Sequence, residues 1–181
     1  MPSLQKLTVS AVCICTLLIL FVVLYQSNYL LELYYFNQLP DLVPPCSLAR
    51  SEAEVISSIG QLGTERSIDK LIQCVFVCEC REHQLDPFAV TTDCIDDALV
   101  GLGFRALPKC LEALCRSKDE NDRVLHRMAN IVFRIYHPNE HIIIMSLYDY
   151  HVWVNEIRGD AQMPPSARAA AENAHDCLER L

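Results

Sequence analysis

The sequence predicts an all-α fold, in which a helical-repeat domain follows an N-terminal single-pass transmembrane helix. Two observations support this prediction. Within residues 104–181, apolar residues such as Leu107, Leu111 and Leu114 recur at three- and four-residue intervals, which places them on one face of a helix. No charged residue occurs between Lys6 and Glu32, and about 20 apolar residues are enough for a helix to cross a bilayer.

The helical pattern returns after roughly 45 residues, an interval typical of armadillo and HEAT-type solenoids. Four pairs of apolar residues share it: Leu107 and Trp153, Leu111 and Ile157, Met128 and Ala174, and Val132 and Leu178. In such solenoids each unit buries its apolar face against the next one. We therefore expect an armadillo- or HEAT-like domain whose helices depend on one another for burial.

In chain order, the sequence divides into four parts. They are a short tail at 1–6, a transmembrane anchor at 7–30, a Pro-containing linker at 31–50 and the helical domain at 51–181. The apolar run is longer than the core of a cleavable signal peptide, and tyrosines follow it as in an interfacial aromatic belt. We expect a retained signal-anchor rather than a cleaved leader.

Capping residues, glycines and prolines separate the helices expected within the domain. These helices cover residues 51–62, 67–78, 91–103, 104–117, 120–141, 147–160 and 165–181. A β alternative remains only at 140–154, where β-branched and aromatic residues cluster. Its alternation of apolar and polar residues is imperfect, so the helical interpretation is preferred.

Composition and motifs exclude several classes of function. The formal net charge is −8 and the chain contains no basic run, whereas nucleic-acid binding requires clustered Lys and Arg. The chain also lacks a Walker-type loop, a G-x-G-x-x-G motif and a G-x-S-x-G nucleophile elbow, which are the signatures of nucleotide binding and serine hydrolysis. We expect no nucleic-acid partner and no cofactor.

The cysteines are expected to pack rather than to react. Of the ten cysteines, Cys13 and Cys15 lie in the anchor and the other eight lie outside it. Several of these eight occur at helical spacing among Leu and Val, where Cys behaves as a small hydrophobe. Cys74, Cys78 and Cys80, followed by His83, lack the repeated spacing of a zinc knuckle. We therefore expect mostly free thiols and no metal site.

A thiol-enzyme interpretation is the alternative for two short segments. The segment containing Cys94 and the segment containing His151 resemble the cysteine and histidine segments of transglutaminase-like enzymes, with Asp160 as the residue that would orient the histidine. A neighbouring base lowers the pKa of a nucleophilic thiol, so the chemistry is reasonable. The intervening sequence predicts consecutive helices, whereas that fold places its histidine and acid on strands.

The run from Leu107 to His141 resembles an armadillo unit, because a short apolar helix leads through a charged loop into a helix bearing alanine and asparagine. More narrowly, it is similar to the armadillo-like segment of the serine active site-containing protein family, membrane-anchored mitochondrial proteins of lipid handling. The lipase-like domain of that family would lie beyond Leu181. The resemblance therefore implies a scaffold or a shortened form in a mitochondrial or ER membrane, without hydrolase activity.

We expect a membrane-anchored scaffold or adaptor that binds an unidentified partner protein, with membrane lipid around residues 7–30. The candidate partner-binding residues are Asn130, Arg134, Trp153 and Glu156, which lie on successive expected helices. A non-catalytic structural subunit of a larger membrane complex is one alternative. The thiol enzyme that uses Cys94 and His151 is the other.

Overall fold

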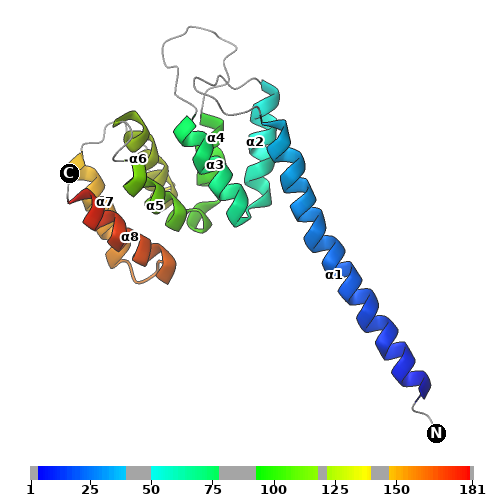
Figure 1. Cartoon of the computed structure of the whole chain (residues 1–181). Helices are drawn as coiled ribbons and strands as arrows, with labels where there is room; N and C mark the ends of the chain where they lie inside the picture. The colour runs from blue at the N-terminus through cyan, green and yellow to red at the C-terminus, as the bar shows by residue number, and fades with distance from the viewer. Residues whose placement is uncertain (1–3, 40–49, 78–92, 118–121, 140–146, 180–181) are drawn as a thin grey trace.

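The computed structural model describes residues 4–39, 50–77, 93–117, 122–139 and 147–179. Every secondary-structure element in these ranges is a helix, which confirms the all-α expectation. Figure 1 shows one long helix extending away from a row of shorter helices.

The elements follow one another as α1 (Leu4–Gln38), α2 (Arg50–Leu62), α3 (Glu65–Val77), α4 (Asp93–Gly101), the 3₁₀ turn η1 (Gly103–Arg105), α5 (Leu107–Ser117), α6 (Asp122–Tyr136), α7 (Leu147–Gly159) and α8 (Pro165–Leu178). The β alternative concerned residues 140–154. Its described part, residues 147–154, lies in α7, so the β alternative is wrong there. Residues 140–146 lie outside the described residues.

The expectation of a transmembrane anchor is not met. In the part of the chain that the structure describes, no helix combines the length and the apolarity needed to cross a membrane. The transmembrane part of the expected fold class, at 7–30, is therefore wrong. The same finding overturns the single-pass location in a mitochondrial or ER membrane.

The carboxyl end of α1 packs against the helical domain. Glu32 is buried and accepts a hydrogen bond from the hydroxyl of Thr64 in the α2–α3 turn. Arg66 of α3 lies 3.4 Å from the other carboxylate oxygen of Glu32 and stacks over the ring of Tyr29, 4.9 Å from its centroid. Because α1 also contacts α2, both buried and charged contacts join it to the domain. The helix α1 continues past residue 30 without interruption to Gln38.

The shorter helices pack in two rows. One row contains α2, α4 and α6, and the other contains α3 and α5, as their mutual contacts show. Asp69 of α3 forms a salt bridge with Lys109 of α5, and Phe76 of α3 lies under the guanidinium of Arg116 of α5. The contacts follow the same order along both helices, so neighbours within this row run parallel, as they do in helical solenoids.

The last two helices join these rows in the order opposite to a strict repeat. A repeat of roughly 45 residues would place α7 beside α5 and α8 beside α6. Instead α8 packs against α5, and α7 packs against α6. A disulfide between Cys115 of α5 and Cys177 of α8 spans a sequence separation of 62. The apolar positions of the repeat are buried, except that Trp153 is only half-buried, but they face a different neighbour.

A single apolar core runs through both rows. Its fully buried members come from every helix between α2 and α8 and include Ile56, Ile59, Leu71, Leu99, Leu111, Met128, Ile131, Tyr150, Ile157 and Ala171. Three- and four-residue spacing within each helix places these residues on its inner face. Most polar residues between them face solvent, but Ser67, Asp96 and Ser117 are buried.

Candidate functional site

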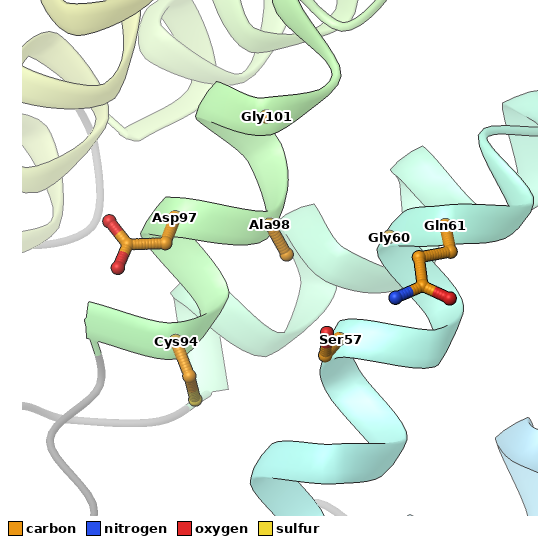
Figure 2. Close-up of a pocket in the computed structure, with 7 residues that line it drawn as sticks. All are labelled: Ser57, Gly60, Gln61, Cys94, Asp97, Ala98 and Gly101. Carbon is orange, nitrogen blue, oxygen red and sulfur yellow. The ribbon is translucent and has the colours of Figure 1, made fainter.

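An open hollow of about 410 Å³ lies between α2 and α4, at the end of the domain nearest to α1. It is lined by Ser57, Gly60, Gln61, Cys94, Asp97, Ala98 and Gly101. Figure 2 shows the α2 residues on one side of the hollow and the α4 residues on the other. Its volume is within the range of ligand pockets, about 300–1,000 Å³.

Small residues produce this hollow. Gly60 is buried, and a Cβ at that position would lie 3.0 Å from the Cβ of Ala98, so α2 and α4 approach most closely there. At Gly101, a Cβ would meet no atom within 4 Å. Close approach at one point and open space one turn later leave a depression that larger side chains would fill.

The polar groups around the hollow come mainly from α2. Ser57 and Gln61 are exposed, and both side chains extend into the gap between the helices (Figure 2). The carboxylate of Asp97 points away from α2 and accepts a hydrogen bond of 2.6 Å from Nη2 of Arg134. The inner walls are therefore uncharged, and the nearest carboxylate joins the site to α6.

Cys94 contributes a half-buried free thiol to the hollow. Burial raises the pKa of this thiol above its usual value, and the nearby Asp96 carboxylate acts in the same direction, while Arg127 opposes them. The thiol therefore stays protonated at neutral pH, which is the opposite of what an activated nucleophile requires.

The structure does not bring Cys94 and His151 together. Cys94 lies on α4, which packs against α2, α3 and α6, whereas His151 lies on α7, which packs against α6 and α8. The ring of His151 instead contacts that of His175, with 5.9 Å between centroids. Asp160 accepts a 2.8 Å hydrogen bond from the backbone N–H of Gln162 in the α7–α8 turn, so none of these contacts forms a catalytic triad.

The four residues expected to bind a partner fall into two pairs. Asn130 and Arg134 are one turn apart on α6, and Arg134 is held by Asp97 of α4. Trp153 and Glu156 lie on α7. The Trp153 ring packs 4.4 Å from that of Phe133 between centroids, which makes it partly a packing residue. Glu156 is exposed, at 3.5 Å from Nε2 of His137.

The described cysteines include both free thiols and one disulfide, so the expectation of mostly free thiols is met only in part. Cys74 and Cys110 are buried free thiols, as expected for small hydrophobes. Cys115 and Cys177 are joined in a disulfide, so the expectation of mostly free thiols is wrong for these two. Of the possible zinc ligands, Cys74 is buried in the core, and residues 78, 80 and 83 lie outside the described residues.

The hollow itself was not anticipated from the sequence. Gly60 and Ala98 are the residues that define it, and they meet only because α2 and α4 are neighbours in one row. The available signal was the pair of small residues at one-turn spacing on α4, Ala98 and Gly101, opposite Gly60 on α2. Small residues on two helices allow a close crossing, but they do not identify which helices cross.

No protein-family model, curated protein or solved structure matches the chain. The similarity to armadillo-like repeats therefore stays a prediction based on the residues from Leu107 to His141.

Proposed function

We propose that this protein is a helical-repeat scaffold that binds a segment of a partner protein in the hollow between α2 and α4. The observation that carries this proposal is the hollow itself: about 410 Å³, open to solvent and bounded by uncharged inner walls. A solenoid presents side chains from successive helices along one surface, and this hollow lies on the row formed by α2, α4 and α6.

The side chains of the hollow suit an extended peptide with an apolar residue. The space beside Gly60, Ala98 and Gly101 accepts an apolar side chain. Ser57 and Gln61 each offer a hydrogen-bond donor and an acceptor, which match the N–H and C=O of a peptide backbone. Arg134, held beside the hollow by Asp97, extends the same surface onto α6, where Asn130 also lies.

A thiol-enzyme function has less support at this site. The thiol of Cys94 has a raised pKa, and the imidazole of His151 lies on α7, beyond α6. A nucleophilic cysteine needs both a lowered pKa and a base within hydrogen-bonding distance.

The test fills the hollow without disturbing the fold. A Gly101→Leu substitution adds a side chain where a Cβ meets nothing within 4 Å, so the helices need not move. Gly159→Leu is the matched control, because Gly159 also ends a helix and its Cβ would also meet nothing within 4 Å. Both variants and the wild type are used as bait in quantitative affinity capture with mass spectrometry.

We expect at least one protein that wild type and Gly159→Leu capture equally and that Gly101→Leu captures at least tenfold less. The direct complex is then confirmed with the purified partner by calorimetry. If every captured protein is retained by Gly101→Leu, the hollow is not a binding site. Stoichiometric partners that are insensitive to Gly101→Leu would instead support the structural-subunit alternative.

A further inference from the structure

A second group of chemically reactive side chains lies at the opposite end of the domain, near the carboxyl end of α8. His175, Asp176 and Glu179 each offer one ligand atom, and these atoms lie within 4.8 Å of one another. Nδ1 of His175 is 4.0 Å from Oδ1 of Asp176 and 3.7 Å from Oε1 of Glu179. The spacing of His175 and Glu179 is i to i+4, so the two side chains leave the same face of the helix.

The imidazole of His175 has a buried nitrogen that lacks a hydrogen-bond partner. Among the residues that the structure describes, Nδ1 of His175 is the one buried side-chain nitrogen or oxygen atom without such a partner. The His175 side chain is only 16 % exposed, whereas the carboxylates of Asp176 and Glu179 are 57 % and 61 % exposed. The buried imidazole nitrogen therefore lies near two solvent-exposed carboxylates that are too distant to accept a hydrogen bond from it.

A second imidazole supports the first. His151 of α7 makes an edge-to-face contact with His175, with ring planes at 85°, and α7 packs extensively against α8. This contact favours one orientation of the His175 ring. The disulfide at Cys177 joins the same end of α8 to α5, so the backbone that carries the three side chains is also held in place.

We propose that His175, Asp176 and Glu179 bind a zinc ion, with His151 as a positioning residue that orients the His175 ring. One imidazole nitrogen and two carboxylate oxygens are ligand types that Zn²⁺ accepts at about 2.0–2.2 Å, whereas Ca²⁺ and Mg²⁺ prefer oxygen ligands throughout. Ligands at those bond lengths lie closer together than these atoms do, and rotation of the two exposed carboxylates supplies the difference. This site is distinct from the hollow and does not depend on the proposed peptide binding.

The test measures Zn²⁺ binding by the full chain in isothermal titration calorimetry. Accessible free thiols are first alkylated with iodoacetamide without reductant, so that they do not bind zinc and the disulfide stays intact. We expect one zinc ion per chain with a dissociation constant in the micromolar range. His175→Ala should weaken binding at least tenfold, and Glu179→Gln, which changes an exposed side chain, should weaken it without affecting the fold.

His137→Ala is the matched control. His137 is also a partly exposed histidine near a carboxylate, with its Nε2 at 3.5 Å from Glu156. Among the described residues, however, it belongs to no group of three possible metal ligands. Its loss should leave zinc binding unchanged, and Mg²⁺ should not bind to the wild type. Equal zinc binding by wild type and Glu179→Gln, or an equal loss in His137→Ala, would show only adventitious binding and overturn the proposal.

Discussion

Asp96 of α4 and Arg127 of α6 form a buried salt bridge within the row of helices that contains α2, α4 and α6. Oδ1 of Asp96 lies 2.8 Å from Nε and 2.7 Å from Nη2 of Arg127, and the side chains are only 10 % and 8 % exposed. Nη1 of the same guanidinium donates to the carbonyl of Val75 near the end of α3, at 3.4 Å. One arginine of α6 therefore contacts both α4 and α3.

We predict that Asp96→Ala lowers the free energy of unfolding by about 3–5 kcal/mol, because it leaves the buried Arg127 guanidinium without its carboxylate. Denaturant unfolding followed by circular dichroism measures this loss. The control is the next residue: Asp97→Ala breaks an exposed pair with Arg134 and should cost only about 0–1 kcal/mol. Similar losses in the two variants would show that the buried pair has no special role in stability.

The disulfide between Cys115 and Cys177 should contribute strongly to stability, because it closes a long loop. For a sequence separation of 62, the chain-entropy model gives about 4 kcal/mol at 25 °C. We predict that reductant lowers the unfolding midpoint of the wild type. The Cys115→Ser/Cys177→Ser double variant should start lower and no longer respond to reductant. A wild-type midpoint that is insensitive to reductant would contradict this prediction.

Sequence periodicity was sufficient for the helices but not for their final arrangement. Leu107, Leu111 and Met128 are buried as expected, and helix 104–117 differs only in that its first residues form the 3₁₀ turn η1. The position of α8 could not be deduced, because a repeat interval does not specify which of two apolar neighbours a helix contacts. The disulfide followed from that position, and cysteine spacing alone does not determine connectivity.

The candidate site was less predictable than the fold. Arg134 was expected on the surface and does lie beside the hollow, held by Asp97. The hollow depends on the absence of side-chain atoms at Gly60 and Gly101, whereas glycines were interpreted from the sequence only as residues that separate helices. A void between two helices exists only once their crossing point is known.

Buried thiols should make the protein sensitive to alkaline pH. Burial raises the pKa of Cys74 to about 11 and that of Cys110 to about 12, from the usual thiol value of 9.0. A raised folded-state pKa gives stability that is complete below the unfolded-state pKa and is lost as the pH rises through the folded value. We therefore predict constant stability up to about pH 9 and a progressive loss between pH 9 and pH 12.

This prediction is tested by denaturant unfolding at a series of pH values. Cys110→Ala should show a shallower decrease above pH 9 than the wild type, because one buried ionisable group has been removed. Tyr150, whose pKa burial raises to about 12, should produce part of the remaining decrease. An identical pH dependence in Cys110→Ala and wild type would indicate that the thiol does not ionise on unfolding.

The contacts of Glu32 should hold the last turns of α1 on the domain. Glu32 is buried, accepts a hydrogen bond from Thr64 and pairs with Arg66. Hydrogen bonds to charged groups contribute about 1.5–3 kcal/mol, which corresponds to roughly 10- to 150-fold in an opening equilibrium. We predict that Glu32→Ala accelerates amide hydrogen exchange in residues 29–38 within this range and leaves exchange in α5 unchanged. The control is Asn37→Ala, since Asn37 is an exposed residue of the same helix. Unchanged exchange in Glu32→Ala would mean that apolar contacts between α1 and α2 are sufficient to hold the helix in place.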